Sequence, residues 1–347
     1  MGTSFRTTVG RLHPGAPVLA AALAAALAAA LAAGCGSSTS TAPTTSPSTA
    51  AHATTTSVPS SSASSGAGLA PPTVPATGAY LGAWLHPGAP GQGSSFAMEQ
   101  ATLPSVVAAT GRPLGLLHVY APWARPAPVA SLRAVAAAGS TPILDWGCGP
   151  DVAQLASGTD DGVISTYASD LRAYGAPVLL RWCWEMNLVG LHPQVGGPSG
   201  FTGAWVHIRS LFRRAGATNV AFVWCPALTG VDPQPYFPGA GEVDWIAVDG
   251  YDRDGTQTFA SLFTPFYRAW VGQGKPMMVG ETGAAGSAQA PFIDSIASGA
   301  PALPAVKAVA YFDAPGPLTT WQFTPAGLQA FARLASQPYF QPRGVNT

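Results

Sequence analysis

Short apolar runs recur between residues 77 and 343, and each is bounded by glycine, proline or polar residues. Continuous runs of this kind are typical of parallel strands that are buried on both faces. The pattern predicts strands at residues 80–84, 114–120, 142–145, 178–182, 220–224, 245–248, 277–279 and 308–312.

Helix-like segments alternate with these runs. Residues 203–215 repeat apolar side chains at helical spacing, and residues 324–335 begin with a Thr-Pro pair that is typical of a helix start. Strand and helix alternate eight times over a length close to the roughly 250 residues of one barrel, which predicts an α/β fold, a single (β/α)8 TIM barrel. The sequence contains no Gly-x-Gly-x-x-Gly after a first strand and no Walker motif, which counts against a nucleotide-binding fold.

The beginning of the chain has a different pattern. Arg6 and Arg11 precede an almost unbroken apolar stretch at residues 17–33, which is the order of an export signal. The stretch ends in Leu31-Ala-Ala-Gly-Cys35, which resembles the bacterial lipobox with its leucine displaced by one position. The resemblance implies a lipoprotein-type signal at residues 1–35 and a lipid anchor on Cys35. A transmembrane anchor and an ordinary cleaved signal are the alternatives.

Residues 36–76 are almost entirely Ser, Thr, Ala, Pro and Gly. Such a segment buries too little apolar surface to offset the entropy of ordering it, so we expect a disordered linker. The domain organisation that follows is signal, linker and one folded domain at residues 77–343. We expect the protein on the extracellular face of the bacterial cell membrane, or secreted.

Composition narrows the class of partner. The chain has 16 basic and 16 acidic residues, no net charge, and 10 tryptophans. This balance argues against nucleic acid and favours an uncharged ligand that stacks on aromatic rings, such as a polysaccharide. No pattern in the sequence calls for a cofactor or a metal, and we expect a monomer.

Three cysteines remain if Cys35 carries lipid: Cys148, Cys183 and Cys225. All three fall near the ends of consecutive predicted strands, so at most one disulfide forms among them. Their spacing leaves the pairing open, and it does not match a zinc site.

Two glutamates follow apolar runs directly. Glu185 lies in Arg181-Trp-Cys-Trp-Glu-Met-Asn187, and Glu281 lies in Lys275-Pro-Met-Met-Val-Gly-Glu-Thr-Gly283, 96 residues later. Three strand-helix units of roughly 30 residues each would place them after the fourth and seventh strands, where barrel loops form active sites. Two carboxyl groups that face each other across a cleft are the machinery of glycoside hydrolysis.

These two motifs, together with Asp249-Gly-Tyr251 between them and Tyr311-Phe-Asp313 near the end, resemble glycoside hydrolase family 26. That family is a clan-A (β/α)8 group known for β-mannanases. The resemblance covers residues 78–340. It implies a retaining mechanism with Glu185 as the general acid/base and Glu281 as the nucleophile, and with Tyr251 and Arg181 supporting Glu281.

Other residues at the predicted strand ends are candidates for binding the substrate. They are Trp184, Asn187, Trp123, Trp146, Trp224, Asp145, Asp249 and Asp313. The acid/base needs a raised pKa, which we expect from Trp182 and Trp184 beside it. Each of these residues also has a structural interpretation, as core packing, loop capping or a hydrogen bond behind the site. We interpret His86 and His118 as structural.

The sequence departs from the family at two places. Trp184 stands where a histidine is common, and Leu188-Val-Gly-Leu-His192 replaces a tryptophan-rich run that shapes the sugar subsites. We therefore expect a retaining endo-glycosidase that cleaves a β-linked polysaccharide, either β-mannan or a related β-glucan. The alternatives are a hydrolase of a cell-envelope glycan and a glycan-binding surface lipoprotein without turnover.

Overall fold

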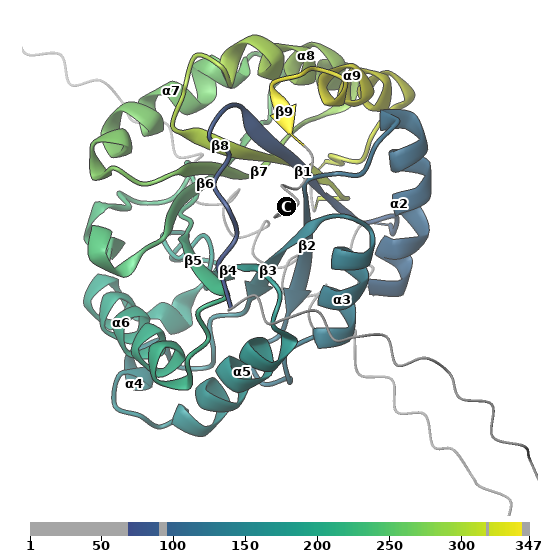
Figure 1. The fold of residues 1–347 in the computed structure, drawn as a ribbon. Helices are drawn as coiled ribbons and strands as arrows, with labels where there is room; N and C mark the ends of the chain where they lie inside the picture. The colour runs from purple at the N-terminus through teal and green to yellow at the C-terminus, as the bar shows by residue number, and fades with distance from the viewer. Residues whose placement is uncertain (1–68, 90–95, 317–318, 342–347) are drawn as a thin grey trace, which may run out of the picture.

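The computed structural model describes residues 69–89, 96–316 and 319–341. The expected export signal with Cys35, and residues 36–68 of the expected linker, lie outside the described residues. The rest of the chain forms a closed barrel of parallel strands, and Figure 1 shows the strands as a ring with the helices outside it. The TIM barrel predicted from the sequence is confirmed.

Strands β1 to β8 follow the predicted order, and each includes most of a predicted apolar run; β9 was not predicted. Their bounds are β1 Ala79–Leu85, β2 Leu116–Ala121, β3 Thr141–Trp146, β4 Val178–Trp182, β5 Val220–Trp224, β6 Trp245–Asp252, β7 Met277–Ala284, β8 Val306–Asp313 and the short β9 Phe340–Gln341. Strand β1 closes the barrel by pairing in parallel with both β8 and β2, and β9 pairs with the start of β1.

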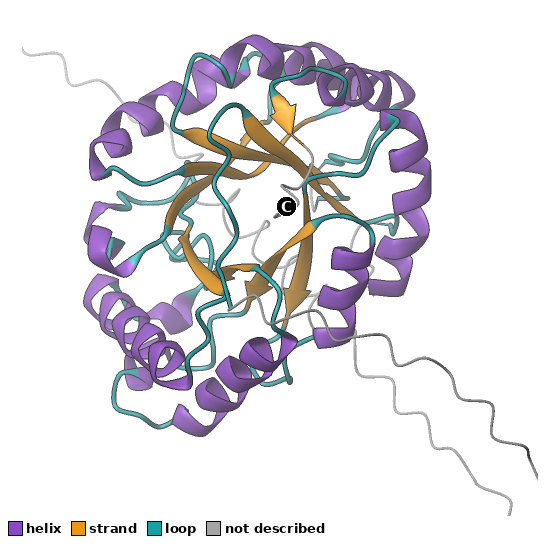
Figure 2. Ribbon diagram, viewed as in Figure 1, coloured by secondary structure: helices purple, strands orange, loops and turns teal. Residues whose placement is uncertain are grey.

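The helices cover the outside of the ring (Figure 2). Their bounds are α2 Phe96–Thr110, α3 Val129–Ala137, α4 Val152–Leu155, α5 Asp161–Tyr174, α6 Pro198–Ala215, α7 Phe259–Trp270, α8 Gln289–Gly299 and α9 Pro325–Ala335. Helix α6 starts five residues before its predicted beginning, at Pro198. The Thr324 hydroxyl accepts a hydrogen bond of 3.0 Å from Gly327 N, which caps α9 as its Thr-Pro start predicts. No helix in the described residues is both long and apolar enough to cross a membrane.

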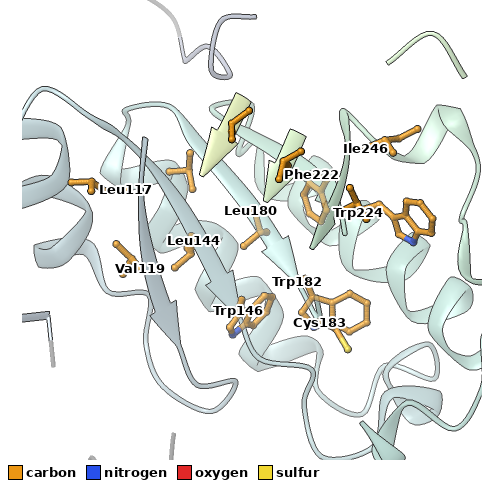
Figure 3. Close-up of a cluster of buried hydrophobic side chains, with 14 of the residues drawn as sticks. Leu117, Val119, Leu144, Trp146, Leu180, Trp182, Cys183, Phe222, Trp224 and Ile246 are labelled. Atoms are coloured by element: carbon orange, nitrogen blue, oxygen red, sulfur yellow. The ribbon is translucent and has the colours of Figure 1, made fainter. Parts of the chain in front are cut away.

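Side chains alternate between the inside and the outside of the barrel along each strand. In β4, Leu179 and Arg181 point inward, while Leu180 and Trp182 pack outward against the helices. The outward residues join the large apolar layer between strands and helices that is shown in part in Figure 3. The inward residues form a smaller apolar cluster, and the polar residues that follow it lie toward the C-terminal ends of the strands.

Strand β7 contains an irregularity that changes this alternation. Met278 pairs with Ala247 of β6, and Glu281 pairs with Asp249. The step from one pair to the next is three residues in β7 but only two in β6, so β7 contains one extra residue. The extra residue lies beside Gly280, and a Cβ there would come within 2.6 Å of the inward-facing Asp249 carboxylate. The bulge therefore lets both Gly280 and Glu281 face the barrel interior. Glu281 lies within β7, not just past its end as the apolar run suggested.

Candidate active site

Arg181 in β4 lies at the centre of a buried charge cluster. Its Nε donates to Asp145 of β3, its Nη1 lies 2.8 Å from Asp249 Oδ2 in β6, and its Nη2 donates to Glu281 Oε1 at 2.5 Å. Burial opposes the charge of Arg181, but these three carboxylates outweigh that effect and hold its pKa above its usual value. One guanidinium thus links strands β3, β4, β6 and β7.

Glu281 is surrounded by hydrogen-bond donors. The hydroxyl of Tyr251 donates to its Oε2 at 2.5 Å, and the hydroxyl of Tyr120 donates to its Oε1 at 2.7 Å. Burial alone would raise the pKa of Glu281, but the charge of Arg181 and these bonds lower it below its ordinary value. The carboxylate is therefore held ionised and fixed in orientation from both sides.

Glu185 has the opposite environment. Burial first, and then the negative charge of Glu281, raise its pKa to about 8, although Arg181 and Arg253 act in the other direction. Its carboxylate accepts no hydrogen bond from the described part of the chain. One oxygen each from Glu185, Asp249 and Glu281 lie within 4.8 Å of one another. The two glutamates that the sequence singles out are therefore brought together, one with a raised pKa and the other with a lowered pKa.

These same three carboxylates are the residues with the spacing to hold a metal ion, among those the structure describes. Two of them, Asp249 and Glu281, already pair with Arg181. The guanidinium supplies the positive charge that a cation would otherwise bring to this place.

Asp145 and Asp249 lie behind the two glutamates. Asp145 is fully buried between Arg181 and His118, whose Nδ1 is 2.6 Å from Asp145 Oδ2. His118 Nε2 lies 3.0 Å from the carbonyl oxygen of Gly280, directly before Glu281. Asp145 thus orients both Arg181 and His118, and Asp249 orients Arg181.

Three of the expected substrate-binding tryptophans lie on the outer face of the barrel instead. Trp146 stacks on Tyr167 of α5 with ring centroids 4.0 Å apart, Trp123 stacks on Trp146 at 4.3 Å, and Trp224 contacts Trp270 of α7 at 4.7 Å. Figure 3 shows Trp146 and Trp224 within this outer apolar layer. The expectation that they line a sugar site is corrected: strand alternation turns Trp146 and Trp224 toward the helices, and Trp123, in the loop after β2, packs on Trp146.

Trp182 is a second correction. It is buried on the outer face against Phe201 of α6, so it does not surround the carboxyl group of Glu185. Trp184 does face the site: its ring meets Tyr120 edge-on at 5.3 Å, and the Arg181 guanidinium lies 5.7 Å from its centroid. Of the two tryptophans expected beside Glu185, only Trp184 faces the barrel interior.

Asn187 and Asp313 hold loops together. The side chain of Asn187 is buried, accepts from Ala227 N at 2.8 Å, and donates to the carbonyl oxygens of Ala227 and Val231 at 2.9 Å each. Asp313 accepts from Phe323 N at 2.7 Å, and burial raises its pKa to about 6. The bonds of Asn187 use both ends of its amide within the loops, so its expected role as a sugar ligand is corrected. The expected role of Asp313 as a sugar ligand stays a prediction.

Sequence reasoning missed Tyr120 as a donor to Glu281 and His118 as part of the charge cluster. The signal was present, because His118 and Tyr120 are two positions apart in the sequence and so share the inward face of β2.

The structure also places the three cysteines. Cys148 and Cys183 form a disulfide, and Cys225 is a buried free thiol with its Sγ 3.1 Å from Asp249 Oδ1.

Several solved structures with a similar barrel are β-mannanases. One from a symbiotic protist of the termite Reticulitermes speratus, in complex with a gluco-manno-oligosaccharide, has a TM-score of 0.58 at 15% identity and covers 77% of this chain and 89% of its own. A family 26 β-mannanase from Bacteroides ovatus has a TM-score of 0.56 at 15% identity, covering 78% and 92%. A modular family 26 endo-β-1,4-mannanase from Cellulomonas fimi has a TM-score of 0.57 at 15% identity, covering 77% and 72%.

The chain therefore has the fold of the glycoside hydrolase family 26 β-mannanases, as its motifs implied. No protein-family model matches the sequence. The chain is also similar to a curated protein, endoglucanase H of Acetivibrio thermocellus, at 28% identity over an alignment of 193 residues. The alignment covers 49% of this chain. The match covers about a fifth (21%) of the length of that relative.

Proposed function

We propose that the protein is a retaining endo-glycoside hydrolase that cleaves a β-linked polysaccharide by double displacement. One observation carries the proposal: carboxyl oxygens of Glu185 and Glu281 lie within 4.8 Å, and their surroundings move their pKa values in opposite directions. Retaining glycosidases hold their two carboxyl groups about 5 to 5.5 Å apart, whereas inverting enzymes need roughly 6.5 to 9.5 Å to fit a water molecule.

In the first step, Glu281 attacks the anomeric carbon of the sugar and the glycosidic C–O bond breaks. Glu185 gives its proton to the departing oxygen, so the leaving chain departs as a neutral alcohol. A covalent ester then joins the sugar to Glu281. Tyr251, Tyr120 and Arg181 keep the attacking carboxylate ionised and aimed at the sugar.

In the second step, water attacks the same anomeric carbon, and the ester bond to Glu281 breaks. Glu185, now ionised, takes the proton from the water and returns to its starting state. Each step inverts the anomeric carbon, so the product retains the β configuration. The proton therefore returns to the residue whose pKa is about 8.

For the substrate we propose β-mannan or a related β-glucan. The support is the β-mannanase fold and the similarity to a protein named endoglucanase. Loops decide substrate choice in this fold, and Trp184 and residues 188–192 are the places where this chain departs from the family pattern. A lipid anchor on Cys35 and a location on the extracellular face of the cell membrane, or secretion, stay predictions.

The test is the release of reducing ends by the full chain on a panel of β-mannans, β-1,3-glucans, mixed-linkage glucans, xylans and envelope polysaccharides. We expect release from at least one of them by the wild type and none by Glu281→Ala. Glu242→Gln, which changes a partly exposed carboxylate that pairs with Arg209 and Arg213, is the control that should act like the wild type. Equal release by wild type and Glu281→Ala would contradict the proposal.

A further inference from the structure

The segment that carries Glu185 has an unusual backbone. Cys183 has a φ of 50° and Glu185 a φ of 55°, and they are the only two non-glycine residues with positive φ among those the structure describes. L-residues avoid this left-handed region because Cβ approaches the carbonyl oxygen. A strained conformation of this kind persists only where the surrounding structure enforces it.

Hydrogen bonds hold each end of this turn. Cys183 N donates to the Trp146 carbonyl at 2.9 Å, Glu185 N donates to the Cys225 carbonyl at 2.7 Å, and Leu188 N donates to the Glu185 carbonyl at 2.9 Å. These bonds anchor single backbone groups on either side of Trp184. They do not by themselves fix the side-chain direction at Cys183, where the left-handed turn begins.

The covalent constraint at that position is the disulfide to Cys148, in the loop after β3. Both cysteines are buried, at 5% and 0% exposure, so the bond lies inside the packed strand ends. The Cys148 Sγ also lies 3.5 Å from His192 Nδ1, and the His192 ring approaches the Trp184 ring at 6.5 Å. The disulfide therefore joins the Glu185 segment to the loop after β3, and it also contacts His192 in the loop that follows Glu185.

We propose that the Cys148–Cys183 disulfide is a positioning device for the Glu185 carboxyl group in proton transfer. This inference rests on the proposed function. Cys183 is two residues from Glu185, and release of its side chain lets the turn relax toward the ordinary extended or helical regions. Such a change in φ moves the carboxyl group away from the oxygen that it must reach within about 2.6 to 3.2 Å.

The prediction separates proton transfer from nucleophilic attack. A leaving group of low pKa departs without a proton, whereas one of high pKa needs Glu185. The Cys148→Ala/Cys183→Ala variant should keep kcat/KM within about threefold of the wild type on a dinitrophenyl glycoside, because Glu281 and its donors are intact. It should lose about 10²-fold on an aryl glycoside with a poor leaving group.

The aryl glycosides carry the sugar that the polysaccharide panel identifies, and both proteins are assayed below the melting temperature of the variant. Alanine is the replacement because both sites are buried and apolar, which favours folding. Azide should raise kcat of the variant on the dinitrophenyl substrate. It attacks the covalent ester in place of the water that a displaced Glu185 fails to activate. An equal loss on all leaving groups, or no loss on any, overturns the proposal.

A second measurement needs no activity. Glu185→Gln removes a buried carboxylate and should raise the melting temperature near pH 9, which is above the pKa of about 8. In the disulfide-free background the carboxylate is able to relax toward solvent, so the same substitution should raise the melting temperature less. Glu242→Gln, the control, should have the same effect in both backgrounds.

An unchanged effect of Glu185→Gln in the two backgrounds overturns the positioning role. If no polysaccharide is cleaved by the wild type, the proposed function fails, and this stability cycle still decides whether the disulfide holds Glu185. If the wild type cleaves a polysaccharide and Glu185→Gln changes the melting temperature equally with and without the disulfide, the proposed function stands and the inference fails. The two failures are therefore distinguishable.

Discussion

At the scale of single residues, Glu185 and Glu281 are the same side chain in two surroundings. Glu281 has two tyrosine hydroxyls and a guanidinium at hydrogen-bond distance, and Glu185 has burial and a neighbouring negative charge. Two carboxyl groups with separated pKa values can serve as proton donor and nucleophile at the same pH.

The raised pKa of Glu185 predicts a pH-dependent stability. The folded protein binds this proton up to about pH 8 and the unfolded chain only up to about pH 4.5, so the contribution to stability is present below pH 4.5 and is lost as pH rises to about 8. Glu185→Gln should therefore melt at a higher temperature than the wild type at pH 8 and above. The difference in melting temperature between the variant and the wild type should shrink toward zero as pH falls to 4.5. A difference that is constant with pH would contradict the raised pKa of Glu185.

Tyr251→Phe should lower kcat/KM by roughly 10²-fold, because it removes one donor from the nucleophile. The hydrogen bond of Tyr251 lowers the pKa of Glu281, so its loss should also move the acidic limb of the pH profile to higher pH. Tyr120→Phe is the matched comparison on the other carboxylate oxygen. A profile with unchanged limbs in Tyr251→Phe would refute this role.

At the scale of elements, the alternation of inward and outward side chains decides which strand-end residues reach the site. Asp145 and Arg181 face inward, and their neighbours Trp146 and Trp182 therefore face the helices. Position at a strand end alone does not distinguish these two faces. The alternation would have removed Trp146 and added Tyr120.

Trp146→Ala should lower the free energy of unfolding by about 3 to 5 kcal/mol and leave KM unchanged, because its ring fills the layer between β3 and α5. Trp184→Ala is the matched change inside the site, and it should alter KM or kcat. Denaturant melts and steady-state kinetics of the two variants measure the contrast. A large KM change in Trp146→Ala would contradict its place on the outer face.

The bulge in β7 was not predictable from the apolar pattern. Regular alternation from Met278 would turn Glu281 outward, and only the extra residue at Gly280 returns it to the interior. Gly280→Ala should abolish activity, since a Cβ would come within 2.6 Å of Asp249 and 2.8 Å of Arg181 Nη1. Gly241→Ala, where a Cβ meets open space, is the control, and full activity in Gly280→Ala would contradict this role of the bulge.

At the scale of the whole molecule, eight strand-helix units bring Glu185 and Glu281 from 96 residues apart to neighbouring positions. Chain order and spacing were enough to predict this, because a parallel barrel collects the C-terminal ends of all strands at one mouth. The Cys148–Cys183 pairing and the loop bonds of Asn187 were not predictable, because they depend on loop paths that one sequence does not determine.

The central claim is that Glu185 and Glu281 form a retaining pair. The most direct test is proton NMR of the first product released by the wild type from the polysaccharide that the panel identifies. Two displacements at one carbon predict that the β anomer of the new reducing end appears first, with the α anomer growing only through mutarotation. Initial release of the α anomer would mean inversion, and it would contradict the account.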